Sequence, residues 1–265
     1  IHRTLDPSAL ARGFAVISSD GGRRGAWTDS TFGQDQQARI DYAYNALEKI
    51  TLLGKQFVTE FYGRPPDWSY HLGCSNGGRQ GLVAAQKLPL LFDGIIAGDP
   101  SMGFSRIAVG EVWNIGVVAR ISPLDPDGRP ILARAFNDAD LKRVRDAVLK
   151  RCDAHDGLVD NLIHDWQRCE FDPAELSCKG AKATDCLSTP QVNALRQLFQ
   201  GPVTKSGRQV YGPFNYDTGI ASASWRGMRL GTAADGKANS ADATLGLGQF
   251  RFYQLTPPDP GFDPL

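Results

Sequence analysis

The sequence predicts an α/β protein with a doubly wound parallel sheet, and two features of its first 100 residues support this class. Short apolar runs typical of buried strands alternate with periodic apolar segments typical of helices. One strand and the helix after it flank the pattern Gly-x-Ser-x-Gly at residues 73–77. Beyond residue 100 the alternation stops. We therefore expect residues 1–100 to form the central part of a sheet domain, and residues 101–265 to form an insertion that covers the carboxyl edge of the sheet.

The first strand and the first long helix are predicted from apolar patterns ahead of this motif. Residues 13–20 are a compact apolar run that ends in polar residues, as in a buried parallel strand whose carboxyl end faces an active-site crevice. A glycine-rich loop follows at residues 21–25. Residues 35–62 carry apolar side chains every three or four positions, which predicts a long amphipathic helix that ends at Gly63.

The motif around Ser75 has the arrangement of a nucleophile elbow, the strand–turn–helix unit of α/β-hydrolases. Residues 68–73 are predicted to be its strand and residues 81–88 its helix. Glycines two positions before and after the serine (Gly73 and Gly77) let strand and helix approach around a strained turn, which lifts the hydroxyl clear of the sheet. Backbone N–H groups at the helix start point to the same place. A bare Gly-x-Ser-x-Gly also occurs in ordinary loops, and the strand and helix around it are what favour a nucleophile.

Helices and loops are expected after the last strand of this region, at residues 92–98. Residues 138–150 predict a helix with Asp138 as its N-terminal cap. Residues 189–200 predict a second helix, which starts with Thr-Pro and stops before Gly-Pro. Between and after these helices we expect cysteine-bearing loops and a stretch rich in Gly, Ala, Ser and Asp from 218 to 248.

The bulk composition argues against several classes of partner. Acidic and basic residues number 29 each among 265, so no nucleic-acid or membrane-surface partner is expected. No apolar run approaches the roughly 18 residues that span a bilayer. The sequence begins with neither Met nor the apolar core of a signal peptide, and we expect it to begin inside a longer product or to have been processed.

Five cysteines suggest an oxidising compartment. Cys152 and Cys169 lie seventeen positions apart, Cys178 and Cys186 lie eight apart, and Cys74 stands alone beside the motif serine. Two local pairs and an orphan favour disulfides, with the partner of the fifth cysteine outside the chain. Five unrelated buried thiols are the alternative. No pair has C-x-x-C spacing, which argues against a zinc site.

The loop after residues 138–150 is acidic. Asp153, Asp156 and Asp160 fall within eight positions around the turn-forming Gly157. Like charges so close repel one another unless a cation neutralises them, and carboxylate and carbonyl oxygens suit calcium. The spacing is not that of an EF-hand, and a solvated acidic turn explains it equally well.

Several stretches of the sequence together resemble the tannase and feruloyl esterase family of α/β-hydrolases. They cover most of residues 9–100 and 138–230, and the Cys-Ser pair of the motif is a specific part of the match. The matching stretches are residues 9–15, 61–66, 73–75 with 77–81, 92–98, 152–163, 168–173, and 186–187 with 189–191.

The resemblance implies a secreted or periplasmic serine carboxylesterase. Its sheet domain would carry an inserted lid domain that holds a structural calcium ion, and the lid would be incomplete here at its C-terminal end. Ser75 matches the nucleophile of the family. Cys74 matches a cysteine whose disulfide partner lies beside the catalytic histidine, which would place that partner outside this chain.

The resemblance also assigns the local disulfides and the calcium ligands. The disulfides would join Cys152 to Cys169 and Cys178 to Cys186. The ion would be bound by five residues, through the side chains of Asp153, Asp156 and Asp160 and the backbone carbonyls of Leu158 and Leu162.

The histidines depart from the family pattern. The family places its acid and a His-Cys pair after the lid, whereas the histidines here are His2, His71, His155 and His164, and none precedes a cysteine. His71 lies in the strand before the motif and is expected to be a satisfied strand residue rather than a base. The loop that supplies the family's other oxyanion donor would also precede Ile1. We therefore expect both ends of the catalytic domain to be missing.

The hypothesis for the intact protein is a two-step acyl transfer from aromatic carboxylic esters, such as hydroxycinnamoyl esters, galloyl esters or terephthalate monoesters. Ser75 would attack, the Asn76 backbone N–H would hold the oxyanion, and a histidine absent from this chain would take the proton. Asp99, at the end of its strand, is a minority candidate for the acid. Because the histidine and one oxyanion donor are absent from it, this stretch alone is expected to be inactive on esters.

Substrate contacts are predicted at Trp225, Arg226 and Arg229, in a segment of the kind that lines an aromatic-acid pocket. An arginine there would suit a substrate with a second carboxylate, and an exposed Trp-Arg packing pair is the alternative. A rival function is a catalytically inactive, calcium-stabilised binding relative. A lipase-like hydrolase is a weaker competitor, because the Cys-Ser motif does not match it. The sequence does not indicate the oligomeric state.

Overall fold

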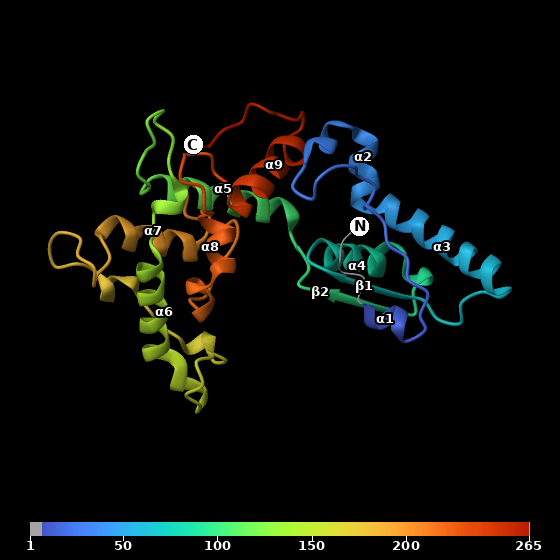
Figure 1. The fold of residues 1–265 in the computed structure, drawn as a ribbon, viewed down its shortest axis with the longest axis horizontal. Coiled ribbons are helices and arrows are strands. Elements are labelled where there is room, and N and C mark those ends of the chain that lie inside the picture. Colours follow the sequence, from blue (N-terminus) through green and yellow to red (C-terminus); the bar gives the residue numbers. More distant parts are fainter. Residues whose placement is uncertain (1–6, 265) are drawn as a thin grey trace. The chain divides into compact units, whose positions relative to one another are not determined.

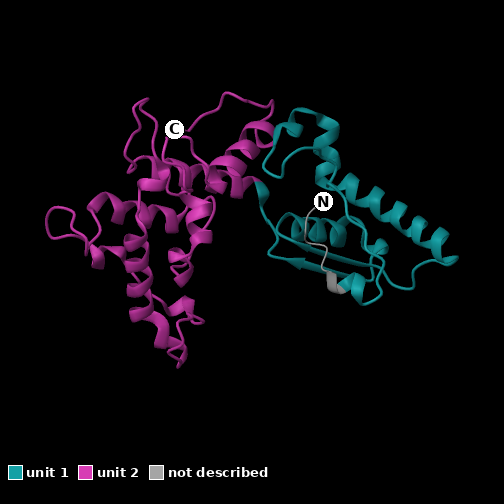
Figure 2. Ribbon diagram, viewed as in Figure 1, with its two compact units in different colours: residues 1–104 teal, residues 105–265 magenta. Residues whose placement is uncertain are grey.

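The computed structural model describes residues 7–264, and the chain divides into two compact units, Ile1–Phe104 and Ser105–Leu265 (Figure 2). The β-strands of the described residues lie in the first unit, and the second unit is built mainly of helices (Figure 1). The elements, in chain order, are α1 (Pro7–Ala11), α2 (Gln36–Ile40), α3 (Ala46–Tyr62), β1 (Tyr70–Cys74), α4 (Asn76–Lys87), β2 (Gly94–Gly98), α5 (Phe104–Ala119), α6 (Asp138–Cys152), α7 (Thr189–Gln200), α8 (Ala223–Arg229) and α9 (Leu247–Gln249).

The sheet of the first unit consists of the parallel strands β1 and β2, close to where the sequence predicts them. They are in register from Tyr70 opposite Gly94 onward. Helix α4 connects them and packs so closely on one face that a Cβ at Gly81 would lie 3.1 Å from the nearest sheet side chains. A strand–helix–strand crossover is the building unit of α/β folds. The α/β class is therefore confirmed, while the doubly wound arrangement stays a prediction.

The long helix expected over residues 35–62 is present and contains one irregular turn. α2, the π-helical turn η2 (Asp41–Asn45) and α3 follow one another without interruption. The side chain of Asp35 caps the start by accepting a hydrogen bond from the Ala38 N–H. Gly63, in the left-handed conformation with φ 70°, ends the helix as predicted.

Residues 13–20 do not form the predicted strand. They carry no strand assignment, and the side chains of Phe14 and Ile17 are 47% and 46% exposed. A strand requires backbone hydrogen bonds to a neighbouring strand, and β1 and β2 pair with each other rather than with this segment. Ile17 instead lies against α3, where a Cβ at Gly54 would come within 2.3 Å of its Cδ1. The apolar run therefore marks a helix contact and not a strand.

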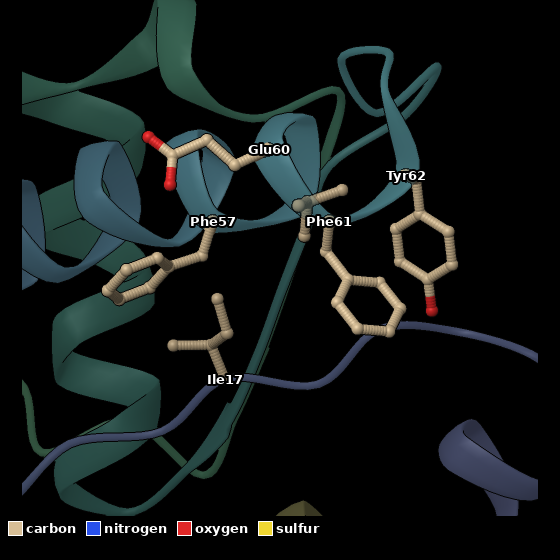
Figure 3. A pocket seen from close by; sticks show the side chains of 6 residues that line it. Ile17, Phe57, Glu60, Phe61 and Tyr62 are labelled. Atoms are coloured by element: carbon tan, nitrogen blue, oxygen red, sulfur yellow. The ribbon is translucent and has the colours of Figure 1, made fainter.

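An open apolar hollow of about 560 Å³ lies between this segment and α3. The rings of Phe57 and Phe61 extend from the helix toward Ile17 (Figure 3). Phe61 is 81% exposed, whereas Leu47, nearer the start of α3, is buried. Much of the apolar stripe that predicts the helix is thus on the surface of the described chain.

The second unit has a continuous apolar core. α5 runs through it and was not expected from the sequence, because this helix is apolar around most of its circumference and lacks the one-sided pattern of a surface helix. No helix among the described residues has the length and apolar character needed to cross a membrane. The largest fully buried side chains of this unit include Phe136, Ile115, Leu132, Leu141, Leu187, Leu195, Ile220 and Leu230.

Helices α6 and α7 both begin with capping boxes. The cap of α6 is Asn137 and not Asp138: its side chain accepts from the Asp140 N–H at 2.8 Å, and Asp140 accepts from the Asn137 N–H at 3.2 Å. Asp138 is the first residue of the helix itself, where a carboxylate favours the helix dipole. α7 begins as predicted, with Ser188 and Gln191 forming the second box.

The stretch rich in Gly, Ala, Ser and Asp, residues 218–248, contains helical segments. α8 is capped by the side chain of Ser222, and a π-helical turn, η9 (Asp242–Gly246), leads into α9. Small residues here allow close packing, since a Cβ at Gly246 would come within 2.4 Å of the Glu111 Cβ. No helix was predicted in this stretch, because its composition gave no apolar periodicity to indicate one.

Candidate active site

Ser75 lies between β1 and α4 in a backbone conformation that is rare for a residue with a side chain. Its φ is 56° and its ψ is −116°. Such a conformation costs on the order of 1–3 kcal/mol and persists only where the surrounding structure holds it. The serine is exposed, and α4 begins with the next residue, Asn76. The predicted strand–turn–helix unit is therefore present, with its hydroxyl accessible.

Two glycines allow the backbone to pack this closely around the turn. A Cβ at Gly73 would lie 2.3 Å from the carbonyl oxygen of Gly77, and a Cβ at Gly78 would lie 2.3 Å from the carbonyl oxygen of Gly98. A Cβ at Gly77 would meet open space. The second close approach predicted for Gly77 thus belongs to Gly78, because the Cβ position of Gly78 is the one that faces β2.

Backbone hydrogen bonds tie the turn to both neighbouring elements. The Ser75 N–H donates to the Gly98 carbonyl of β2 at 3.0 Å, and the Ser75 carbonyl accepts from the Arg79 N–H of α4 at 3.0 Å. Asp99, the next residue after β2, also has a positive φ, of 40°, and is exposed. Its role as a catalytic acid stays a prediction.

Asn76 is held by a polar network that the sequence did not reveal. As the first residue of α4, it has a backbone N–H that the helix itself leaves without an acceptor. Its side-chain oxygen accepts hydrogen bonds from the Tyr42 hydroxyl at 3.0 Å and from Arg79 Nε at 2.8 Å. One sequence signal could have pointed to this network: Arg79 is a cation in the first turn of a helix, where the helix dipole disfavours it.

The described histidines either have a hydrogen-bond partner other than Ser75 or belong to the second unit. Nε2 of His71 lies 3.0 Å from the Gly77 carbonyl oxygen, which confirms it as a satisfied strand residue. His155 and His164 belong to the second unit, and Nδ1 of His155 is buried without a hydrogen-bond partner among the described residues. His2 lies outside the described residues.

The cysteines pair as the resemblance implies. Disulfides join Cys152 to Cys169 and Cys178 to Cys186. Cys74, beside Ser75, is an exposed free thiol. Two disulfides fit an oxidising, extracellular environment.

The acidic loop is ordered by its own backbone. Asp153 is buried, and its carboxylate accepts hydrogen bonds from the N–H groups of Asp160 and Asn161 at 3.3 and 3.1 Å. Asp156 accepts from the Leu158 N–H at 2.9 Å, and this bond lowers the pKa of its carboxyl. Across residues 7–264, no three His, Cys, Asp or Glu side chains come together as a metal site. The calcium ion, with Leu162 as a further ligand, stays a prediction.

The predicted substrate-binding side chains have partners inside the second unit. Arg226 donates to the carbonyls of Ala133 and Phe136 and forms an ion pair with Asp138 at 2.8 Å. Trp225 is half-buried against the apolar core. These contacts favour the packing alternative for this segment, and its substrate role stays a prediction.

Arg229 belongs to a buried charge cluster that the sequence did not reveal. Its Nη1 lies 2.9 Å from a carboxylate oxygen of Asp242, which has no solvent exposure. Burial raises the pKa of Asp242 to about 6 and that of Glu111 to about 8, and the neighbouring charge of Asp242 adds to the rise at Glu111. One oxygen of Glu111 is buried without a hydrogen-bond partner in the described chain. These carboxylates come from helical segments far apart in sequence, so no local pattern signals them.

Comparison with known proteins places these features in a family. A family model described as tannase and feruloyl esterase matches residues 1–245. Mono(2-hydroxyethyl) terephthalate hydrolase of Piscinibacter sakaiensis is 37% identical over 281 residues, covering 96% of this chain and 46% of that protein. A probable feruloyl esterase B-2 of Aspergillus flavus is 34% identical over 201 residues, covering 76% and 37%. The chain thus spans less than half the length of these relatives.

Solved structures share the fold. An esterase from Aspergillus oryzae matches with a TM-score of 0.75 and 24% identity, covering 96% of this chain and 46% of that one. Feruloyl esterase B from Aspergillus oryzae matches with a TM-score of 0.69 and 24% identity, covering 88% and 42%. The serine turn is in place and the family model matches residues 1–245 of the chain, so the chain belongs to the tannase and feruloyl esterase family.

Proposed function

We propose that the protein carrying this chain is a serine carboxylic ester hydrolase and that Ser75 is its nucleophile. The observation that supports this most is the exposed serine on a strained turn at the carboxyl end of β1. Backbone strain in folded proteins clusters at functional sites. Membership of the family supports an ester as the substrate.

The reaction would proceed in two steps through an acyl-enzyme. The Ser75 oxygen attacks the ester carbonyl carbon while its proton passes to a histidine supplied from outside these 265 residues. The bond from that carbon to the alcohol oxygen then breaks, and the histidine returns the proton to the alcohol. In the second step water attacks the acyl carbon and gives a proton to the histidine. The acid leaves as the serine regains that proton.

The Asn76 backbone N–H would stabilise the tetrahedral oxyanion of both steps. It sits at the start of α4, where the partial positive charge of the helix dipole adds to the effect. A second donor would come from a loop outside this chain. Loss of one such donor typically lowers kcat by roughly 10²–10³.

The substrate class that we propose is aromatic carboxylic esters. Support comes from the relatives, which include a terephthalate monoester hydrolase and a probable feruloyl esterase. Gallate esters belong to the same chemical class. In the segment predicted to contact them, Arg226 and Arg229 already have internal carboxylate partners. A substrate carboxylate bound by one of these arginines would share its guanidinium group with that internal partner.

We further propose that the acidic loop binds a structural calcium ion in a secreted or periplasmic protein. The donor chemistry fits, since three carboxylates and nearby carbonyls are hard oxygen ligands. Asp153 is buried and forms no ion pair among the described residues, so a cation would compensate its charge. The side chains of Asp153, Asp156 and Asp160 and the carbonyls of Leu158 and Leu162 would hold it. Its contribution would be to fix the loop.

The test is ester hydrolysis by the complete gene product and by its Ser75→Ala variant. The wild type is expected to hydrolyse methyl ferulate or a terephthalate monoester, and the variant to lose about 10⁴-fold or more in kcat. A variant with undiminished activity would refute the assignment. A wild type that binds phenolic ligands but hydrolyses none of the esters would favour the catalytically inactive, calcium-stabilised binding relative.

A further inference from the structure

The Asn76 side chain joins the start of α4 to the irregular turn of the long helix. Its Oδ1 accepts from the Tyr42 hydroxyl at 3.0 Å and from Arg79 Nε at 2.8 Å. An amide oxygen has two lone pairs, so both are used. A side chain held by two donors cannot rotate freely, and it restrains the backbone unit to which it is attached.

Arg79 is itself held on three sides. Its Nη1 donates to the Ala43 carbonyl at 3.1 Å and its Nη2 to the Tyr42 carbonyl at 2.8 Å. Its Cζ also lies 4.7 Å from the centre of the Tyr42 ring. The guanidinium group is a planar and rigid fork, so these bonds fix the position of Nε, which donates to Asn76.

The π-helical turn η2 explains how a helix carbonyl can serve this purpose. The Ala46 N–H donates to the Asp41 carbonyl five residues back, whereas a regular α-helix would direct it to the Tyr42 carbonyl. Arg79 donates to the Tyr42 carbonyl instead. Turns of this kind inside α-helices occur frequently at functional sites. The irregularity therefore serves a contact with the serine turn.

The position of Arg79 in α4 also indicates that this residue restrains the serine turn. It is the fourth residue of the helix, where the dipole disfavours a cation. Its backbone N–H bonds the Ser75 carbonyl while its side chain bonds Asn76. One residue thus restrains both the proposed nucleophile and the proposed oxyanion donor.

We propose that Arg79 and Tyr42 are positioning residues that keep the Asn76 backbone N–H directed at the oxyanion formed beside Ser75. The proposal rests on the esterase function proposed above. Both would act through their hydrogen bonds to Asn76 and not by contact with the substrate. A donor helps most when it is held in place before the charge develops, because no reorganisation is then needed during the reaction.

The test compares Tyr42→Phe and Arg79→Met in the complete gene product with an aryl ester as substrate. Tyr42→Phe removes a single hydroxyl and keeps the ring, so it is expected to fold and to lower kcat roughly 3–10-fold, the equivalent of one hydrogen bond. Arg79→Met removes three donors and is expected to lower kcat roughly 10²-fold, approaching loss of the oxyanion donor. KM is expected to change less than kcat in both, because the bond to the oxyanion forms in the transition state.

Inhibition by benzeneboronic acid separates positioning from a loss of folded protein. Its serine adduct is tetrahedral and places an oxygen at the oxyanion position, so its inhibition constant should rise in parallel with the fall in kcat/KM. Arg79→Lys keeps the charge but lacks the planar fork, so its loss should be intermediate. Arg64→Met is the matched control, since Arg64 forms an exposed ion pair with Asp67, and it should change neither quantity.

The two proposals fail in different ways. If Ser75→Ala is inactive while Tyr42→Phe and Arg79→Met keep the wild-type kcat and boronate affinity, the positioning role is refuted and the esterase assignment stands. If Ser75→Ala keeps full activity, the assignment of Ser75 as the nucleophile is refuted, and with it the reason to position the Asn76 N–H beside Ser75. A loss of activity in Tyr42→Phe without weaker boronate binding would also refute positioning of the oxyanion donor.

Discussion

The two units of the chain differ in where they keep their apolar side chains. In the second unit, α5, α6 and α7 enclose a core in which Leu195 and Val144 have no solvent exposure. In the first unit, large apolar side chains of β1, β2 and α3 are on the surface, with Ile96 64% and Phe61 81% exposed. The second unit also carries both disulfides and both capping boxes.

The difference shows that the apolar core and the proposed catalytic turn are in different units of the chain. The strained serine turn lies in the unit with the less buried core, and hydrogen bonds and glycine contacts hold it locally. The second unit gains its stability from buried apolar area and from constraints on its unfolded state. Substitutions in the second unit should therefore mainly lower the free energy of unfolding. Substitutions in the first unit should mainly change the geometry of the serine turn.

The largest expected effect is on the core of the second unit. Leu195→Ala should lower the free energy of unfolding by about 2–5 kcal/mol, because it opens a cavity at a fully buried site. Phe61→Ala, at an exposed site in the first unit, should change it by less than about 0.5 kcal/mol. Urea unfolding of the 265-residue chain with separate probes in each unit measures both. Equal losses in the two variants would contradict the distinction between the units.

How well the sequence predicts the fold depends on how local each signal is. α7 was predicted because its apolar periodicity and its Thr-Pro start lie within one segment. Residues 13–20 were wrongly predicted as a strand, because pairing depends on another strand that composition does not reveal. α5 was missed because a buried helix loses the one-sided pattern.

A smaller effect is expected at the glycines of the serine turn, where two neighbours differ. Gly78→Ala would bring a Cβ within 2.3 Å of the Gly98 carbonyl oxygen and should cost about 1–3 kcal/mol, because backbone must move. Gly77→Ala meets open space and should be tolerated. Thermal unfolding and ester hydrolysis of both variants measure the contrast. The comparison is wrong if Gly77→Ala proves the more harmful of the two.

The candidate site was predictable only in its local part. Gly-x-Ser-x-Gly lies within five residues, so the turn and the exposed serine follow from the motif. The contacts of Asn76 with Tyr42 join segments 34 residues apart, and no spacing rule connects them. The carboxylates of Glu111 and Asp242 acquire raised pKa values only through burial in the folded unit.

A pH dependence is also expected, and it is confined to the second unit. Burial raises the pKa of Glu111 from its ordinary value of 4.5 to about 8, with Asp242 adding to the rise and Arg229 opposing it. The unfolded chain loses this proton near pH 4.5 and the folded chain near pH 8. The unfolded state therefore binds fewer protons between these values, and stability falls as pH rises through this window.

Glu111→Gln should remove this part of the pH dependence. Relative to wild type, the variant should become more stable as the pH rises from 4.5 to 8, as measured by the midpoint of thermal unfolding at each pH. Glu175→Gln, at an exposed carboxylate with a long ion pair of 3.9 Å to Arg151, is the matched control and should follow the wild type. Parallel curves for wild type and Glu111→Gln would show that Glu111 does not keep its proton in the folded chain.

Covalent trapping of the nucleophile tests the role of Ser75 most directly. The complete gene product would be treated with a fluorophosphonate, digested, and analysed by peptide mass spectrometry. We predict one modified peptide, with the phosphonyl group on Ser75, and no such peptide from Ser75→Ala. Modification of a different serine with loss of activity, or unchanged labelling of Ser75→Ala, would contradict the proposal that this strained turn presents the nucleophile.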